Sequence, residues 1–291
     1  MNLRAAALAL VACASPALAD RLALQGELIQ GGLVRGATEP GASVALDERA
    51  IRVSPDGAFV LGFGRDAKQA TLRVRFPDGT IVDRPLTIAQ RSYQVQRIDG
   101  LPQRQVTPPE EDLALIRDER AAVAAARATD SASAAWRKAF IWPASGPISG
   151  VYGSQRILNG EPRRPHLGVD IAAPAGTAVI APSDAKVVLA RPGLYFNGAM
   201  VILDHGHGVT SSYSHLSTIA VREGGAVRQG QQIGAIGATG RVTGAHLHWG
   251  ISVFDVALDP ALLVPSPIPA SADAPTATVP AAPGSSPPAS R

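Results

Sequence analysis

The first part of the chain is dominated by short runs in which apolar and polar residues alternate. Between about Leu22 and Ile98 these runs are VALDERAIRVS, GAFVLGF, TLRVRF, TIVDRPLTI and YQVQRI. A period of two is typical of strands that bury one face. Pro55–Gly57 and Pro77–Gly79 both read PDG and are typical of hairpin turns. The pattern predicts a small antiparallel β-sandwich, which we assign to residues 20–100.

The pattern changes to that of a helix after this region. Thr107 is a suitable capping residue, prolines are tolerated in a first turn, and the acids of Glu110–Asp112 suit the positive end of a helix dipole. The run LALIRDERAAVAAARA that follows is rich in strong helix formers. We therefore expect a connecting helix from about Pro109 to Ala128, inside a linker that spans residues 101–135.

From Trp136 the β pattern returns, as short Val and Ile runs with frequent glycines and no sustained 3.6-residue period. Two stretches, PAGTAVIAPSDAKVVLA and EGGAVRQGQQIGAIGATG, each join a glycine turn to a short apolar strand. This echo favours a two-sheet, barrel-sandwich-like domain over residues 136–265. Residues 266–291 are mostly Pro, Ala, Ser and Thr and are predicted to form a disordered tail. The predicted fold class is therefore mainly β with one helix.

The first 19 residues have the features of a secretory signal peptide. A short basic region precedes an apolar run, and Ala17–Ala19 gives a small-x-small cleavage site. The run is too short for a transmembrane segment, so we expect export, with the periplasm as the destination. In an alternative interpretation, Leu10–Cys13 is a lipoprotein processing site and leaves an acylated Cys13. Cys13 is the only cysteine, so after cleavage at Ala19 a metal site must use His, Asp or Glu.

Charge excludes one class of partner. The formal net charge is +3, and the Lys and Arg residues are scattered along the chain. A nucleic-acid-binding stripe is therefore not expected. The mild positive charge suits a polyanionic surface such as a cell wall.

All six histidines lie between positions 166 and 248. His166 and Asp170 are four residues apart, so an extended segment turns both toward one face. Imidazole and carboxylate together suit Zn²⁺. One more histidine would complete a set of three ligands and leave a fourth position for water, which is the arrangement of a catalytic zinc.

Two HxH stretches compete for that third ligand. His205 and His207 are flanked by glycines, so we interpret both as residues of a hairpin turn. His246 and His248 continue into an apolar strand, where residues two apart share a face. Ligation is assigned to this second pair, although the spacing does not say which member binds. His215, in the extended segment SYSHLS, fits a structural histidine and a site residue equally well.

Taken together, the His166–Asp170 pair, SYSHLS and AHLHWG resemble the lysostaphin/LytM-type family of zinc metalloendopeptidases, which cut peptidoglycan cross-bridges. The resemblance covers about Trp136 to Leu263 and includes the flanking stretches VYGSQRILNGEPRRPHLGVDIAAPAGT and GATGRVTGAHLHWG. It implies Zn²⁺ as cofactor and peptidoglycan as partner. The N-terminal sandwich, the helix and the tail lie outside it.

The resemblance also implies a role for each residue of the site. His166, Asp170 and His248 would be the zinc ligands. His246 and His215 would be the histidines beside the metal, with His246 favoured as general base and His215 as stabiliser of the oxyanion, and the reverse left open. Arg156 is a candidate for contact with the substrate, and a structural ion pair explains it equally well.

Two other functions were weighed against the peptidase. One is a noncatalytic or autoinhibited wall-binding protein that activates other peptidoglycan hydrolases. The family contains members that have lost ligands, but this chain keeps all five positions. The other is a lipoyl- or biotinyl-type carrier, which needs a lysine at a hairpin tip. Lys186 in SDAKVVLA is in a predicted strand, so the carrier is disfavoured.

Overall fold

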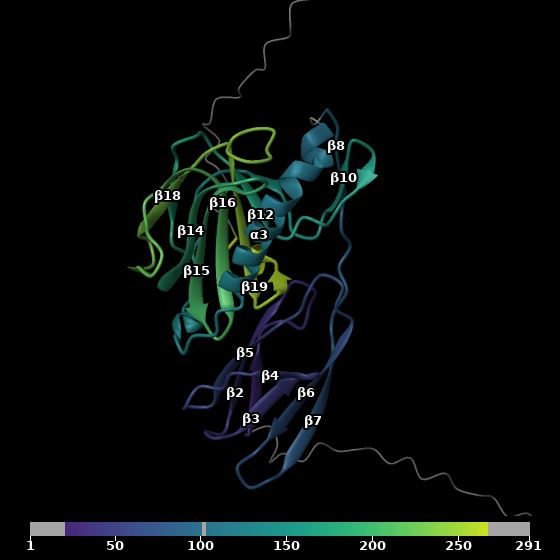
Figure 1. The fold of residues 1–291 in the computed structure, drawn as a ribbon. Helices are drawn as coiled ribbons and strands as arrows, with labels where there is room; N and C mark the ends of the chain where they lie inside the picture. The colour runs from purple at the N-terminus through teal and green to yellow at the C-terminus, as the bar shows by residue number, and fades with distance from the viewer. Residues whose placement is uncertain (1–20, 101–102, 267–291) are drawn as a thin grey trace, which may run out of the picture.

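The computed structural model describes residues 21–100 and 103–266 and shows a mainly β protein with one long helix (Figure 1). The predicted signal peptide with Cys13 lies outside the described residues, as does the predicted tail from residue 267 onward. No helix among the described residues is long and apolar enough to cross a membrane.

The N-terminal unit is an antiparallel sandwich, as the alternating pattern predicts. Its first sheet has the order β1-β2-β5, formed by Leu22–Gln25, Leu33–Thr38 and Ala58–Gly62. Its second sheet has the order β4-β3-β6-β7, formed by Arg49–Ile51, Ser43–Leu46, Gln69–Arg75 and Ile81–Thr87. Apolar side chains from both sheets share one core, which includes Val34, Phe59, Leu61, Leu72 and Val74.

The last run assigned to this sandwich, YQVQRI, is placed differently by the structure. Strand β8 (Val95–Ile98) pairs in parallel with β10 (Gln155–Leu158), which also pairs with β11 (Glu161–Pro162). The prediction of a sandwich strand here was wrong. The alternation that the run shows marks a strand but does not name its neighbour, and this neighbour is some sixty positions further along the chain.

The connecting helix is present. Helix α3 spans Glu110–Arg127 between the caps Pro109 and Ala128, with three acids in its first turn. A short helix α2 (Gln103–Val106) precedes it, and the 3₁₀ turn η1 (Ala135–Arg137) follows it. Near its C-terminal end, Ala126 packs on apolar side chains of the second β unit, namely Leu189, Leu194, Met200 and Ile202. The helix therefore lies along the face of that unit (Figure 1).

The second β unit is built on a branched antiparallel sheet of ten strands with the main order β17-β14-β15-β16-β19-β12-β9. The strands are β9 (Ile148–Gly150), β12 (Val169–Ala172), β13 (Ala178–Ile180), β14 (Ala185–Leu194), β15 (Gly198–Gly206), β16 (Val209–Ile219), β17 (Ala226–Val227), β18 (Gln232–Ile236), β19 (His246–Val253) and β20 (Val256–Leu258). A 3₁₀ turn, η2 (Pro260–Leu262), follows.

Strands β13 and β18 branch away from the main path and supply a second layer. Strand β18 pairs with both β13 and β16, and β20 pairs with β19. Val179, Ile233 and Ile236 from this branch share a core with residues of the main sheet such as Val201 and Trp249. The described strands thus form a layered β domain and do not close into a barrel.

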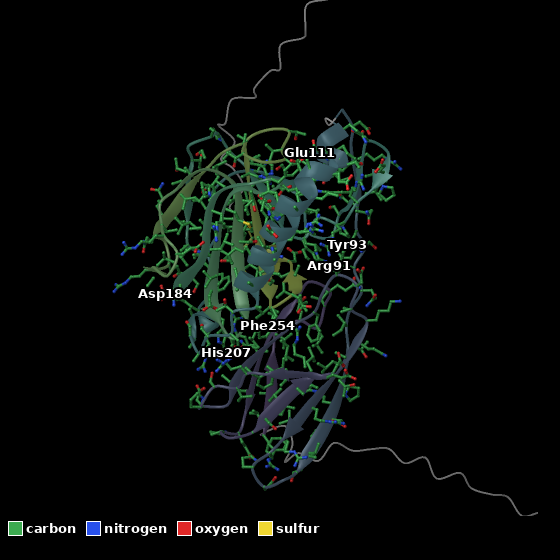
Figure 2. All side chains as sticks on the ribbon, viewed as in Figure 1. Arg91, Tyr93, Glu111, Asp184, His207 and Phe254 are labelled. Carbon is green, nitrogen blue, oxygen red and sulfur yellow. The ribbon has the colours of Figure 1, made fainter. Side chains whose placement is uncertain are left out.

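The two β units are in direct contact. Leu33 and Val60 of the sandwich join the core of the second unit. Arg91 makes an ion pair of 2.8 Å with Asp259, and Arg49 makes one of 2.6 Å with Asp255. Arg91, Tyr93 and Phe254 are seen at this junction in Figure 2. The division of the chain at residues 100 and 135 stays a prediction.

The indole of Trp136 is a suitable test of this junction. It is 2% exposed and belongs to the same core as Leu33 and Val60, and its ring lies 5.1 Å from that of His207. We expect Trp136→Ala to lower the free energy of unfolding by about 3–5 kcal/mol, because a large cavity replaces the indole. Ile81→Ala removes an apolar side chain that is 47% exposed and serves as the control. Equal urea midpoints for the two variants would contradict this interpretation.

Candidate metal centre

The centre is set by the pairing of two neighbouring strands. The antiparallel register of β12 and β19 places Asp170 opposite His248, and Ala172 opposite His246. His166 lies in the loop before β12, where its backbone N–H donates to the carbonyl of Ser154 at 2.8 Å. Side chains two apart on a strand share a face, so His246 and His248 lie on the same side of β19.

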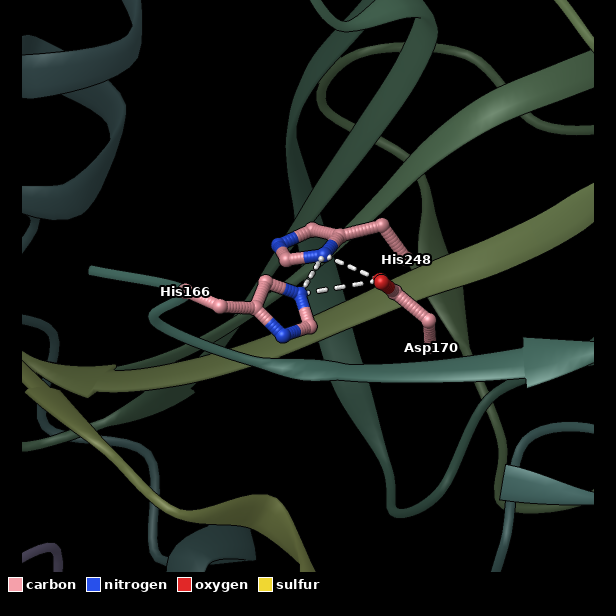
Figure 3. Close-up of side chains that lie close together, drawn as sticks. All are labelled: His166, Asp170 and His248. Atoms are coloured by element: carbon pink, nitrogen blue, oxygen red, sulfur yellow. Dashed lines mark hydrogen bonds and ion pairs between the residues drawn. The ribbon is translucent and has the colours of Figure 1, made fainter. Parts of the chain in front are cut away.

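Three ligand atoms converge at this point (Figure 3). His166 Nε2 lies 2.9 Å from Asp170 Oδ1 and 2.9 Å from His248 Nδ1. His248 Nδ1 lies 2.8 Å from the same carboxylate oxygen. These separations are close to the ~3.3 Å between two ligands that bind one zinc ion at tetrahedral angles. His166, Asp170 and His248 thus form, within the described part of the chain, a group of side chains that could hold a metal ion.

The chemistry of the donor set also fits a cation. His166 Nδ1 lies 3.1 Å from the carbonyl oxygen of Val151, which can only accept, so Nδ1 carries a proton. In the neutral ring Nε2 then presents a lone pair to the Asp170 carboxylate. Two acceptors face each other at that distance only if a cation or an additional proton lies between them. A metal ion in this place satisfies the lone pairs of all three residues together.

Asp170 is a buried anion held by three cationic or polar neighbours. It is 6% exposed. Burial by itself would raise the pKa of this carboxyl. Without a metal ion, hydrogen bonds from His166 and His248 rings that carry the additional proton reverse the effect and hold the pKa far below its usual range. Arg156 Nη2 donates to the other oxygen, Oδ2, at 3.2 Å. Arg156 therefore makes an ion pair with a candidate ligand, and its contact with substrate stays a prediction.

Two glycines allow the backbone to approach these side chains closely. A Cβ atom on Gly168 would lie 2.7 Å from His248 Cε1, and one on Gly150 would lie 2.3 Å from Asp170 Oδ2. Both distances are too short for real contacts. Glycine at these positions is therefore required by the packing around the ligands.

His246 and His215 lie beside the centre, where the sequence predicts them. His246 Nε2 is 3.9 Å from Asp170 Oδ1, and the rings of His215 and His246 are 4.9 Å apart. His246 Nδ1 lies 2.9 Å from the Gly244 carbonyl, and His215 Nδ1 lies 2.9 Å from the Thr239 carbonyl. Carbonyls only accept, so in both neutral rings Nδ1 carries the proton and Nε2 presents a lone pair.

The sequence predicts an extended segment around His215, but the backbone of this residue is not extended. Its φ is 65°, in the left-handed region that residues other than glycine rarely adopt. The pairing of β15 with β16 shifts register here, so that Ser214 and His215 oppose the single residue Met200. This β-bulge re-aims the His215 side chain. Burial lowers the pKa of His215 to about 3, so the ring is neutral at pH 7.

A small cavity of about 160 Å³ opens beside these residues. Gln96 and Ile98 of β8 form part of its wall, and Arg241 and Thr243 line the side that leads to His246. Sequence reasoning missed these four residues. Arg241 and Thr243 lie in the stretch GRVTGAHLHWG, directly before the histidine pair, so proximity in sequence was an available signal. For Gln96 and Ile98 the sequence offers no comparable signal.

His205 and His207 lie away from the centre and have structural environments. His207 and Gly208 form the two-residue turn between β15 and β16, with φ values of 54° and 76°. His205 is a fully buried residue of β15 rather than of the turn. Its Nδ1 donates to the Asp184 carbonyl at 2.9 Å, and its Nε2 lies 2.7 Å from Ser211 Oγ.

Comparison with known proteins agrees with this geometry. Residues 164–260 match the family described as Peptidase family M23. The peptidoglycan DD-endopeptidase ShyA of Vibrio cholerae is 46% identical over 89 residues, which are 31% of this chain and 20% of ShyA. The lipoprotein NlpD/LppB homolog of Pseudomonas aeruginosa is 37% identical over 124 residues, 43% of this chain and 39% of that protein. The chain thus spans well under half of the curated relatives it matches.

A solved structure matches more of the chain. The crystal structure of a candidate M23 peptidase from Pseudomonas aeruginosa is similar with a TM-score of 0.64 and 29% identity, over 81% of this chain and 95% of that one. The similarity therefore extends beyond residues 164–260. The chain therefore contains a peptidase M23 domain, which includes residues 164–260.

Gly168 gives a prediction for the centre. We expect Gly168→Ala to displace His248 and to lower the affinity for zinc by about tenfold or more, as supporting substitutions around metal ligands do. Gly193→Ala is the control, because a Cβ there meets nothing within 4 Å. Zinc titration of both variants checks this. Equal affinities would show that the ring of His248 is not held against Gly168.

His205 gives a prediction for pH dependence. Burial lowers its pKa to about 4, whereas the unfolded chain keeps the ordinary value near 6.5. As the pH falls from 6.5 to 4, His205 binds a proton in the unfolded state but stays neutral in the folded state. The free energy of unfolding therefore decreases in that pH range. We expect the free energy of unfolding of the wild type to fall by about 3 kcal/mol more over this range than that of the His205→Gln variant. Urea unfolding at several pH values measures it, and parallel curves would contradict it.

Proposed function

We propose that this protein is a zinc-dependent endopeptidase that hydrolyses peptide cross-links of peptidoglycan. The observation that carries the proposal is the convergence of His166 Nε2, Asp170 Oδ1 and His248 Nδ1 within 2.9 Å of one another. It occurs in an M23 domain whose relatives include proteins named peptidoglycan DD-endopeptidases.

In this proposal His166, Asp170 and His248 hold the metal. When bound, the zinc ion would lower the pKa of a water molecule and polarise the scissile carbonyl. The chain's own residues prepare that site. The Val151 carbonyl fixes the tautomer of His166, and Arg156 fixes one oxygen of Asp170 so that the other points to the histidines. Arg156 thereby acts as a positioning residue.

His246 is proposed as the general base. Its Nδ1 proton is engaged by the Gly244 carbonyl, so Nε2 is the atom that accepts a proton from water. His215 has the same arrangement with Thr239, but its pKa of about 3 makes it a weak base. We assign it to the oxyanion. His215 Nε2 can donate a hydrogen bond to the oxyanion only when the ring carries a second proton. The negative charge that develops on that oxygen favours the doubly protonated ring.

The cellular location is also proposed. The signal features of residues 1–19 support export, with peptidoglycan then within reach of the domain. Cleavage after Ala19 is favoured, and acylation of Cys13 is the second option.

A second function is favoured by one observation. The cavity beside the metal centre, at about 160 Å³, is below the 300–1,000 Å³ of usual ligand sites, and β8 forms part of its wall. In an autoinhibited or noncatalytic protein, β8 would stay in place beside the candidate metal centre. The protein would then act by binding peptidoglycan and activating other hydrolases.

Measuring zinc content together with muropeptide release from purified sacculi tests the proposal. We expect the wild type to bind zinc and cleave. His246→Ala should keep the metal and lose about a hundredfold or more in rate, since general base catalysis typically contributes that much. His248→Ala should lose the metal as well.

Two results would contradict these assignments. Loss of zinc in His246→Ala would exchange the roles of the two histidines. A wild-type protein that binds zinc, cleaves nothing and stimulates another hydrolase would favour the second function over the peptidase.

A further inference from the structure

A larger cavity lies between helix α3 and the M23 domain. Its volume is about 1090 Å³, at the upper end of ordinary ligand sites. Helix α3 lines one side, and the strand β10 region and the segment around Arg241 line the other. We call this cavity the arginine chamber, because eight arginines line it and only two acids, Glu119 and Asp255, do.

Arg49, Arg156 and Arg163 of this lining each have a carboxylate partner. Arg49 pairs with Asp255 at 2.6 Å and Arg156 with Asp170 at 3.2 Å. Arg163 pairs with Glu161. The other acid of the lining is also engaged, since the Glu119 carboxylate accepts from the backbone N–H of Tyr195 at 2.9 Å.

Four other arginines of the lining have no such partner. They are Arg117, Arg120, Arg127 and Arg164, and within residues 21–100 and 103–266 no carboxylate lies within 4.0 Å of their guanidinium groups. Arg117, Arg120 and Arg164 are exposed and Arg127 is half-buried, so the cost of an unpaired charge falls mainly on Arg127.

The crowding shows in the electrostatics of individual groups. Burial, and then repulsion by Arg164, lowers the pKa of Arg127. Burial, and then repulsion by Arg156, Arg163 and Arg120, lowers the pKa of Arg241. The arginines of the chamber are thus close enough to repel one another electrostatically.

Side-chain carboxylates are few in the part of the given sequence that the structure does not describe. Outside the described residues the sequence contains two side-chain carboxylates, Asp20 and Asp273. Asp20 stands next to the predicted cleavage site, and Asp273 is a single charge. An anion that pairs with several arginines of this lining would therefore come from another molecule.

The chamber adjoins the catalytic cavity. Arg156, Leu158 and Arg241 line both. A peptide bound in the chamber would therefore lie beside the smaller cavity, which His246 and Asp170 line. An endopeptidase substrate is such a peptide, and its free carboxylates are the anions that guanidinium groups bind best in bidentate pairs.

We propose that the arginine chamber is a substrate subsite that binds the free carboxylates of an acidic peptide strand, with Arg127 and Arg164 as its specificity-determining residues. The proposal rests on the proposed peptidase function for the identity of the peptide. It rests on the chamber alone for the preference for carboxylates.

Two ligands that differ only in charge test this. One is a cross-linked disaccharide-peptide dimer purified from sacculi, and the other is the same dimer with its carboxylates converted to carboxamides. Binding is measured with full-length His246→Ala, so that the ligand is not consumed. We expect the native dimer to bind about tenfold more tightly or better, and the difference to shrink as salt is raised.

Variants locate the effect. In the same background, Arg127→Gln with Arg164→Gln should remove the preference for the native dimer. Arg127→Lys with Arg164→Lys should keep most of it, which separates lost charge from lost folding. Arg75→Gln with Arg84→Gln is the matched control, since both residues are exposed on the N-terminal sandwich and removing them changes the net charge equally.

The outcomes separate this inference from the proposed function. Equal binding of the two dimers, no binding of either, or a preference that survives Arg127→Gln with Arg164→Gln would overturn the inference. A preference that these substitutions remove supports it, whether or not the wild type cleaves. Absence of cleavage by a wild type that shows the preference would count against the peptidase alone.

Discussion

The antiparallel register between β12 and β19 is the constraint on which the rest of the site depends. It places Asp170 opposite His248 and so brings together a carboxylate and an imidazole that lie 78 positions apart in the chain. A shift of one residue would turn one of them to the opposite face of the sheet. The apolar residues between them, Val169 and Ile171 on β12 and Leu247 and Trp249 on β19, point into the core and hold that register.

The buried carboxylate of Asp170 sets the requirements for its neighbours. An ionised carboxyl that is nearly excluded from water is stable only if several groups compensate for it. Here two imidazoles and the guanidinium of Arg156 do so. The close approach at Gly150 and Gly168 follows from the same crowding. The two imidazoles, the guanidinium and the two glycines around the centre therefore all serve to accommodate the buried charge of Asp170.

Much of this arrangement could be predicted from the sequence. The sandwich, the helix and the β character of residues 136–265 follow from local periods and propensities, which the structure confirms. The histidines and Asp170 were found by their spacing, and the resemblance to a known family divided the roles between His246 and His248. Those roles stay predictions.

The rest depended on contacts between distant segments, which local patterns do not record. Strand β8 alternates like any sandwich strand, yet it pairs with β10. His215 is in a segment that reads as extended, yet a bulge gives it a left-handed backbone. The arginines of the chamber are scattered along the sequence, and only the packing of α3 against the M23 domain gathers them.

The pairing of β8 with β10 has a consequence for how the protein can be divided. The cavity beside the candidate metal centre takes part of its lining from Gln96 and Ile98 and the rest from residues beyond 148, so neither part of the chain contains the complete lining. An M23 domain separated from these residues would keep its candidate metal ligands but would expose the edge of β10 that β8 now covers. The smallest part of this protein that holds the whole lining is therefore the M23 domain together with β8, and a boundary drawn between the two β units at residue 100 would divide the cavity.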